Sequence, residues 1–309
     1  MYFPIKLKHF KKSYINHTPI PKQLIEKLMR ETADECPFST FPYVFNMNSS
    51  QANRIHKTGN CITLSMYLKD KLSKHDIQSI LIPATIPRMY SHPNYLNISH
   101  VALAILINLD EAYICDPAFY FKEPMKVSAI NTQPSEIISQ NIYQNLPEPL
   151  IYKTVFQPQQ HILNPYQKIP ANSFHVETFK KQDPTDIWKY YLMEILNPDQ
   201  AISSFYISTK RLPFIACVNQ SFQMTLYIKF IDQNTISIKN HNDTLYQGNI
   251  HEIPHDVLLI IQPCMIKHFG TSFNKYFNLP PDVNSKIYHI KDQPRTKKNK
   301  KKKTKKKYT

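Results

Sequence analysis

Apolar residues recur at helical spacing in two stretches near the start of the chain. Residues 19–33 place aliphatic side chains on one helical face, and Pro21 is acceptable near the start of a helix. Residues 59–76 repeat cysteine and leucine at three- and four-residue intervals. Asn60 is a good N-cap there, so the pattern predicts a buried helix whose first turn holds Cys61.

After residue 76 the apolar pattern shortens to strand-like runs rich in β-branched and aromatic residues. The runs 77–86, 100–109 and 111–121 are bounded by turn residues. Only a short polar break at Asp110 and Glu111 separates the last two. They are therefore predicted to form a β-hairpin.

The second half of the chain mixes the two patterns. Residues 125–183 are rich in Pro and Asn with short strand-like pieces such as 150–156, and residues 184–196 cluster apolar side chains in a way that predicts a second long helix. Further antiparallel strands are predicted at 203–209, 224–231 and 235–240. No internal repeat is evident.

Composition supports a globular body with a basic tail. Of the 309 residues, 42% are hydrophobic and 12% aromatic, which is enough to bury a sizeable core. Ten of the basic residues lie in residues 295–309, so their removal from the net charge of +15 leaves about +5. This tail is predicted to be disordered. It is suited to bind nucleic acid or an anionic membrane surface, to act as a nuclear-localisation signal, or to serve as a solvated solubility tail.

Cysteine usage and the termini indicate an intracellular, soluble protein. The five cysteines are widely spaced and have no paired spacing such as Cys-x-x-Cys. A disulfide framework or zinc finger is therefore not expected, and a reducing compartment fits better. No signal-peptide or transmembrane segment is predicted, because residues 100–109 are too short to span a bilayer. The expected location is the cytoplasm. A nuclear location is the alternative if the Lys-rich tail acts as a nuclear-localisation signal.

The scarcity of glycine excludes several chemistries. Glycine occurs only at positions 59, 248 and 270, so no Gly-rich dinucleotide or phosphate-binding loop and no Gly-x-Ser-x-Gly motif can be present. The histidines are scattered and no His-Glu-x-x-His motif occurs. No metal site and no permanently bound cofactor are predicted.

Three residues in chain order supply the parts of a cysteine-based catalytic triad. Cys61 opens a helix, where the dipole and free N–H groups stabilise a thiolate. His100 opens a strand and can take the thiol proton, and Asp116 on the next strand can orient the imidazole. Gly59 is interpreted as a tight, left-handed turn or a close backbone approach that leaves amide N–H groups free for an oxyanion. Singly, each residue also fits a structural role: a core cysteine, a strand start and an Asp-Pro turn.

The triad sets a condition on the hairpin. A two-residue loop at Asp110 and Glu111 would give paired positions an odd sum, and Asp116 would then point away from His100. Convergence of His100 and Asp116 therefore predicts an odd-length loop, such as 109–111, or a β-bulge before Asp116.

Cys61, His100 and Asp116 follow one another at intervals of 39 and 16 positions. This order and spacing resemble those of the arylamine N-acetyltransferases and the wider transglutaminase-like, papain-related superfamily. The sequence "KTGNC" at 57–61 stands where the acetyltransferases carry Arg-Gly-Gly-x-Cys, and 99–121 resembles their His strand, hairpin and Asp strand. More weakly, 203–215 and 235–245 resemble stretches of their C-terminal half.

The resemblance implies an α+β fold with three domains followed by the tail. They are a helical domain (1–77), an antiparallel β-barrel (78–183), an interdomain helix with an α/β lid domain (184–290), and the Lys-rich tail (291–309). It implies a monomeric acyltransferase in which Cys61 is the nucleophile, His100 the base and Asp116 the orienting carboxylate. Acetyl-CoA would be the co-substrate and a small arylamine or hydrazine the acceptor.

Two alternatives remain open at the level of sequence. The residues after Asp116 read Pro-Ala-Phe, which is closer to transglutaminase-like proteases than to typical acetyltransferases. The same triad could therefore serve a peptidase or amidase. A degenerate fold that binds a partner or nucleic acid through the tail is the non-enzymatic alternative.

Overall fold

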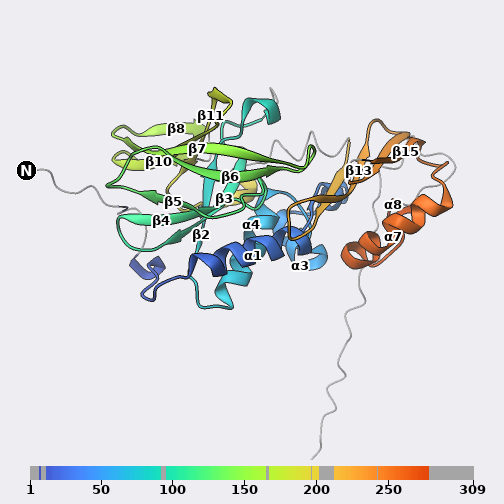
Figure 1. Cartoon of the computed structure of the whole chain (residues 1–309), viewed down its shortest axis with the longest axis horizontal. Coiled ribbons are helices and arrows are strands. Elements are labelled where there is room, and N and C mark those ends of the chain that lie inside the picture. The colour runs from blue at the N-terminus through green and yellow to red at the C-terminus, as the bar shows by residue number, and fades with distance from the viewer. Residues whose placement is uncertain are drawn as a thin grey trace, which may run out of the picture.

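The computed structural model has two large antiparallel sheets and one two-stranded sheet, with helices packed beside the large ones (Figure 1). It describes residues 7, 12–91, 95–164, 167–195, 197–201, 212–241 and 243–277. The Lys-rich tail and the predicted strand 203–209 lie outside these residues. The α-helices described are α1 (Lys22–Glu35), α2 (Phe41–Val44), α3 (Ser49–His56), α4 (Cys61–Ser73), α5 (Pro198–Ala201), α7 (His255–Phe269) and α8 (Phe273–Phe277), with short 3-10 helices η1 (Lys12–Tyr14) and η2 (Arg88–Tyr90).

Both predicted N-terminal helices are confirmed. Helix α1 buries Ile25, Leu28 and Met29 on one face, as its apolar spacing requires. Helix α4 is almost wholly buried along the face that carries Leu64 and Leu68. None of the described helices is long and apolar enough to cross a membrane.

The larger sheet has eight strands and is nearly closed into a barrel. Its strands, in order across the sheet, are β5 (Met125–Ser128), β4 (Glu111–Cys115), β3 (His100–Leu106), β2 (Ile80–Ala84), β11 (Asp183–Tyr191), β10 (Ser173–Lys180), β7 (Leu146–Gln157) and β6 (Ser135–Asn141). The segment before β5 reaches the opposite edge of the sheet. There the N–H of Lys122 donates to the carbonyl of Ile138 at 2.9 Å, and the N–H of Gln140 donates to that of Tyr120 at 3.1 Å. These bonds bring the two edges of the sheet together.

The helix predicted over 184–196 is wrong, because residues 183–191 form strand β11 of the barrel. The decisive pattern is alternation: Asp186, Trp188 and Tyr190 are buried while Ile187 is 43% exposed. A period of two is the signature of a strand with one buried face. Clustered aromatic residues obscure this period, since they also fit one face of a helix.

The smaller sheet has five strands and lies beside α7 and α8 (Figure 1). Its order is β1 (Phe38–Ser39), β12 (Phe214–Val218), β13 (Met224–Phe230), β14 (Thr235–Asn240) and β15 (Asp243–Asn249), and a separate hairpin joins β8 (His161–Asn164) to β9 (Gln167–Ile169). The strands predicted at 224–231 and 235–240 are confirmed as β13 and β14. Aromatic rings of Phe41, Phe230 and Phe277 form the core between this sheet and α8.

The chain therefore has the predicted α+β architecture, with an antiparallel barrel and a second, smaller β unit. Strand β1 comes from the N-terminal segment, yet it pairs with β12 in the smaller sheet. Strand β11 extends the barrel to Tyr191. The predicted domain limits at 77 and 183 stay predictions.

Candidate active site

Cys61 is the first residue of α4, and the cap that starts this helix is well defined. The Asn60 side-chain oxygen accepts hydrogen bonds from the N–H groups of Ile62 at 3.1 Å and Thr63 at 3.3 Å. The Ser49 hydroxyl donates to the same oxygen at 3.1 Å. The predicted cap and the placement of Cys61 in the first helical turn are thus confirmed.

Gly59 is explained by close packing and not by a left-handed backbone. The left-handed residue in this turn is Lys57, with φ 49° and ψ 42°, at the end of α3. Gly59 does not have a positive φ, so that part of the expectation is wrong. A Cβ at Gly59 would lie 2.3 Å from Thr63 Oγ1 and 2.8 Å from the Tyr43 hydroxyl. Only a residue without a side chain fits between the helix and Tyr43.

Most backbone amides of the turn are already used. The N–H of Gly59 donates to Pro37 O at 3.3 Å, and that of Asn60 donates to the Tyr43 hydroxyl at 2.9 Å. Among the described residues, the N–H of Cys61 has no acceptor. The N–H of Thr58 likewise has no acceptor there, but only the N–H of Cys61 lies at the helix N-terminus, where it can face a developing oxyanion.

The hairpin that carries His100 and Asp116 has the register that lets them meet. Leu103 lies opposite Cys115 and Leu106 opposite Ala112, so paired positions have an even sum. The loop is odd in length, as predicted, but lies one residue earlier than 109–111. It contains residues 108–110, because the N–H of Ile107 donates to Glu111 O at 3.0 Å. His100 and Asp116 consequently share one face of the sheet.

Asp116 follows directly after β4 and is completely buried among hydrogen-bond donors. Its Oδ2 accepts from His100 Nε2 at 2.6 Å and from the Tyr190 hydroxyl at 2.7 Å. Its Oδ1 accepts from the N–H groups of Ala118 and Phe119, each at 3.1 Å. Four donors satisfy a buried carboxylate, so Asp116 is held in one orientation.

Tyr190 is a site residue that was missed in the sequence, because it lies in the segment predicted as a helix. Trp188 Nε1 donates to the Tyr190 hydroxyl at 3.1 Å, which continues the chain of hydrogen bonds beyond Asp116. The available signal was the alternation of Trp188 and Tyr190 on one face of a strand.

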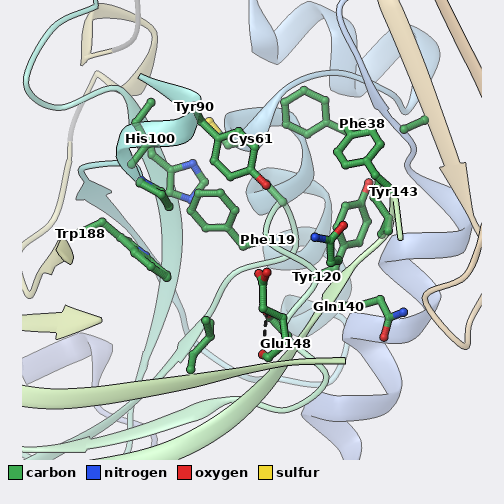
Figure 2. A pocket seen from close by; sticks show the side chains of 18 of the residues that line it. Phe38, Cys61, Tyr90, His100, Phe119, Tyr120, Gln140, Tyr143, Glu148 and Trp188 are labelled. Carbon is green, nitrogen blue, oxygen red and sulfur yellow. Dashed lines mark hydrogen bonds between the residues drawn. The ribbon is translucent and has the colours of Figure 1, made fainter. Parts of the chain in front are cut away.

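Cys61 and His100 lie next to each other (Figure 2), close enough for the sulfur to contribute to the pKa of the imidazole. Since Nε2 is bonded to Asp116, the other ring nitrogen faces the sulfur. Both side chains are almost fully buried, with 6% of Cys61 and 3% of His100 exposed. Burial lowers the pKa of His100, but Asp116 and Cys61 outweigh it and raise the pKa to about 10. The charged imidazolium is thus the favoured form beside the sulfur at neutral pH.

The sulfur faces a cavity of about 290 Å³ whose walls include several aromatic rings (Figure 2). Phe119 lies against His100 with ring centroids 4.6 Å apart, and Tyr90 stacks on Phe119 at 5.9 Å. Phe38 and Phe214, from the smaller sheet, close another side of the cavity. The cavity is of a size and polarity suited to a small, flat organic molecule.

All five cysteines are free thiols. Within the described ranges, no group of three His, Cys, Asp or Glu side chains is placed to hold a metal ion.

Several similar solved structures are arylamine N-acetyltransferases. The enzyme from Mycobacterium smegmatis aligns with a TM-score of 0.49 at 11% identity, over 90% of this chain and 95% of that chain. One from Bacillus cereus, described as having a Cys-His-Glu catalytic triad, aligns with a TM-score of 0.48 at 11% identity, over 88% of this chain and 100% of that one. The Mycobacterium marinum enzyme in complex with CoA aligns with a TM-score of 0.44 at 10% identity, over 83% of this chain and 89% of that chain.

No protein-family model matches the sequence, and no curated protein matches it. At identities of 10–11% and TM-scores of 0.44–0.49, the structural likeness carries no argument about substrate or activity. Those have to be inferred from the geometry around Cys61.

Proposed function

We propose that the protein is a cysteine-dependent acyltransferase that moves an acetyl or other acyl group from acyl-CoA, through a thioester on Cys61, to a small amine acceptor. The observation that supports this most is the arrangement of Cys61, His100 and Asp116 at the cavity wall: the sulfur lies beside the imidazole, and the imidazole is hydrogen-bonded to Asp116 at 2.6 Å. A nucleophile, a base and a group that orients the base are the parts that acyl transfer requires.

In the first half-reaction, the Cys61 thiolate attacks the carbonyl carbon of the acyl-CoA thioester. The His100 imidazolium lies against the sulfur, and the dipole of α4 points its positive end at it; both stabilise the thiolate. The oxyanion is placed to accept a hydrogen bond from the N–H of Cys61. The bond between the acyl carbon and the CoA sulfur then breaks, and the CoA thiolate takes a proton from His100.

In the second half-reaction, the acceptor amine attacks the acyl-Cys61 carbonyl. His100, now neutral, accepts the proton that the nitrogen loses. The bond between the acyl carbon and Cys61 breaks, which restores the thiolate and the imidazolium and releases the amide. Asp116 holds the imidazole in the tautomer that keeps one nitrogen directed at the sulfur.

The direct test is incubation with acetyl-CoA followed by intact-mass measurement. We expect the mass of one acetyl group on the wild-type chain, none on Cys61→Ala, and loss of the adduct when an arylamine or hydrazine is added. An unmodified wild-type chain under the conditions used for Cys61→Ala would refute the proposal. Labelling of Cys61 by a peptide electrophile without an acetyl adduct would support a peptidase or amidase instead.

A further inference from the structure

A charged pair lies in the wall of the cavity. Lys180 Nζ, at the end of β10, donates to Glu148 Oε1, on β7, at 2.7 Å. The two side chains are only 18% and 21% exposed, and both line the cavity that contains Cys61. Figure 2 shows Glu148 at the opposite end of the cavity from Cys61 and His100, with its carboxylate directed towards the rings of Phe119 and Tyr90.

Only half of the Glu148 carboxylate is satisfied within the described part of the chain. Lys180 bonds Oε1, and no donor among the described residues reaches Oε2. Oε2 is not among the buried polar atoms that lack a partner, so it is reachable from the cavity and not sealed inside the protein. The free oxygen is therefore available to a ligand that brings its own donor.

The surroundings favour a neutral N–H donor over an anionic group. The Tyr90 hydroxyl lies near Glu148, and burial, with the nearby Tyr143 and Glu148, raises its pKa to about 12. It therefore stays a neutral hydroxyl, and Lys180 is already engaged by Glu148. An anionic group at this end of the cavity would meet the Glu148 carboxylate with no uncommitted cation beside it among the described residues.

We propose that Glu148 determines acceptor specificity by binding an amide N–H group at the end of the acceptor remote from the amine that is acylated. This inference rests on the proposed acyl transfer. It defines the acceptor class as flat aromatic amines or hydrazines that carry a carboxamide-type donor, in preference to those that carry a carboxylate. Glu148 acts on binding and orientation, and Lys180 holds its carboxylate in place.

The test compares 4-aminobenzamide with 4-aminobenzoate, which match in shape but differ in donors and charge. With the wild-type chain, we expect kcat/KM to be at least ~10-fold higher for the amide, the size of a hydrogen bond to a charged group. Glu148→Gln offers its own N–H donors, so it should abolish or invert this preference. Glu148→Asp should retain part of it.

A matched control is available one residue further along the chain, just after the end of β10. Lys181 Nζ pairs with Glu136 at 2.8 Å, but these side chains are 57% and 41% exposed, and neither lines the cavity. Glu136→Gln should leave the ratio of the two acceptors unchanged.

Failure of this inference and failure of the acyltransferase proposal are separable. Acetylation of Cys61 by acetyl-CoA does not involve Glu148, so intact mass reports on the proposed function alone. Binding of the same two amines to the Cys61→Ala chain, measured by calorimetry, tests Glu148 even where no acyl-enzyme forms. Equal binding of the amide and the benzoate, or tighter binding of the benzoate, would overturn the inference. A preference that survives Glu148→Gln unchanged would do the same.

Discussion

Replacing Gly59 by alanine tests whether close packing beside Tyr43 positions the nucleophile. The new Cβ would lie 2.3 Å from Thr63 Oγ1 and 2.7 Å from Thr63 Cβ. Both Tyr43 and Thr63 are fully buried, and the Tyr43 hydroxyl is hydrogen-bonded to the N–H of Asn60. Neither neighbour can move without a loss elsewhere.

We expect Gly59→Ala to lower the free energy of unfolding by about 2–4 kcal/mol. Over-packing of a tight interior costs about 1–3 kcal/mol, and disruption of one buried hydrogen bond adds about 1 kcal/mol. The shift should also move Asn60 and the adjacent thiol, so alkylation of Cys61 by iodoacetamide should change in rate. Urea denaturation and a timed alkylation measure the two effects.

The other two glycines provide controls that separate clash from backbone strain. A Cβ at Gly248 would meet the Tyr246 hydroxyl at 2.7 Å, but this is the end of a partly exposed, flexible side chain. Gly270 has φ +67° with nothing within 4 Å, so alanine there costs only the left-handed conformation, about 1 kcal/mol. Neither change should alter Cys61 alkylation. A Gly59→Ala chain as stable as Gly248→Ala would refute the packing explanation.

Three further predictions concern ionisable groups. Asp116→Asn should lower the pKa of His100 from about 10 toward its ordinary value of 6.5, visible in an NMR titration of the imidazole. Tyr190→Phe removes one of two hydrogen bonds to Asp116 Oδ2 and should cost about 1–3 kcal/mol in urea denaturation, with little loss expected if the hydroxyl were solvated. His56 and His268 each place Nδ1 near the other's backbone oxygen, at 2.9 and 3.4 Å, and burial lowers both pKa values, that of His268 to about 4. The unfolded chain therefore binds more protons between pH 6.5 and 4, so stability present above pH 6.5 should fall by up to about 3 kcal/mol toward pH 4. His268→Gln should remove most of this dependence of the free energy of unfolding on pH. An unchanged pH dependence would show that His268 is not its source.

The parts of the site that follow from local sequence were predictable. An N-cap acts within one turn, so Asn60 before an apolar periodic stretch was enough to place Cys61 at the start of α4. For the hairpin, the odd length of the loop was predictable, but its position in the sequence was not. The observed loop lies one residue before the predicted one because the Asn108 side-chain oxygen accepts from the N–H groups of Asp110 at 2.7 Å and Glu111 at 2.9 Å. The polar residues at 110 and 111 did not show that Asn108 belongs to the turn.

The contributions of Tyr190 and Glu148 depend on strand pairing between segments far apart in the sequence. β11 is a strand because it fits between β2 and β10 and buries Trp188 and Tyr190 in the barrel, an effect of tertiary structure on residues whose own pattern also fits a helix. Glu148 reaches the cavity only because β7 lies beside β10 in the same sheet. The alternation of Trp188 and Tyr190 is a local signal for the strand, but which strands lie beside β11 and β7 leaves no periodic signal in a single sequence.

The candidate site consists of two halves, each held in place by its own contacts. How these two halves pack against each other could not be predicted from the sequence. The cap of α4, with Tyr43 and Asn60, holds Cys61, whereas the barrel strands hold His100 through Asp116. A buried contact joins the halves: the Ser65 hydroxyl donates to Val101 O at 3.2 Å. Ser65 lies one turn after Cys61, and Val101 directly follows His100, so this bond fixes the helix against the strand within one residue of the base. The identity of the two reacting groups is thus a property of short sequence motifs, whereas their separation is a property of how α4 packs on β3.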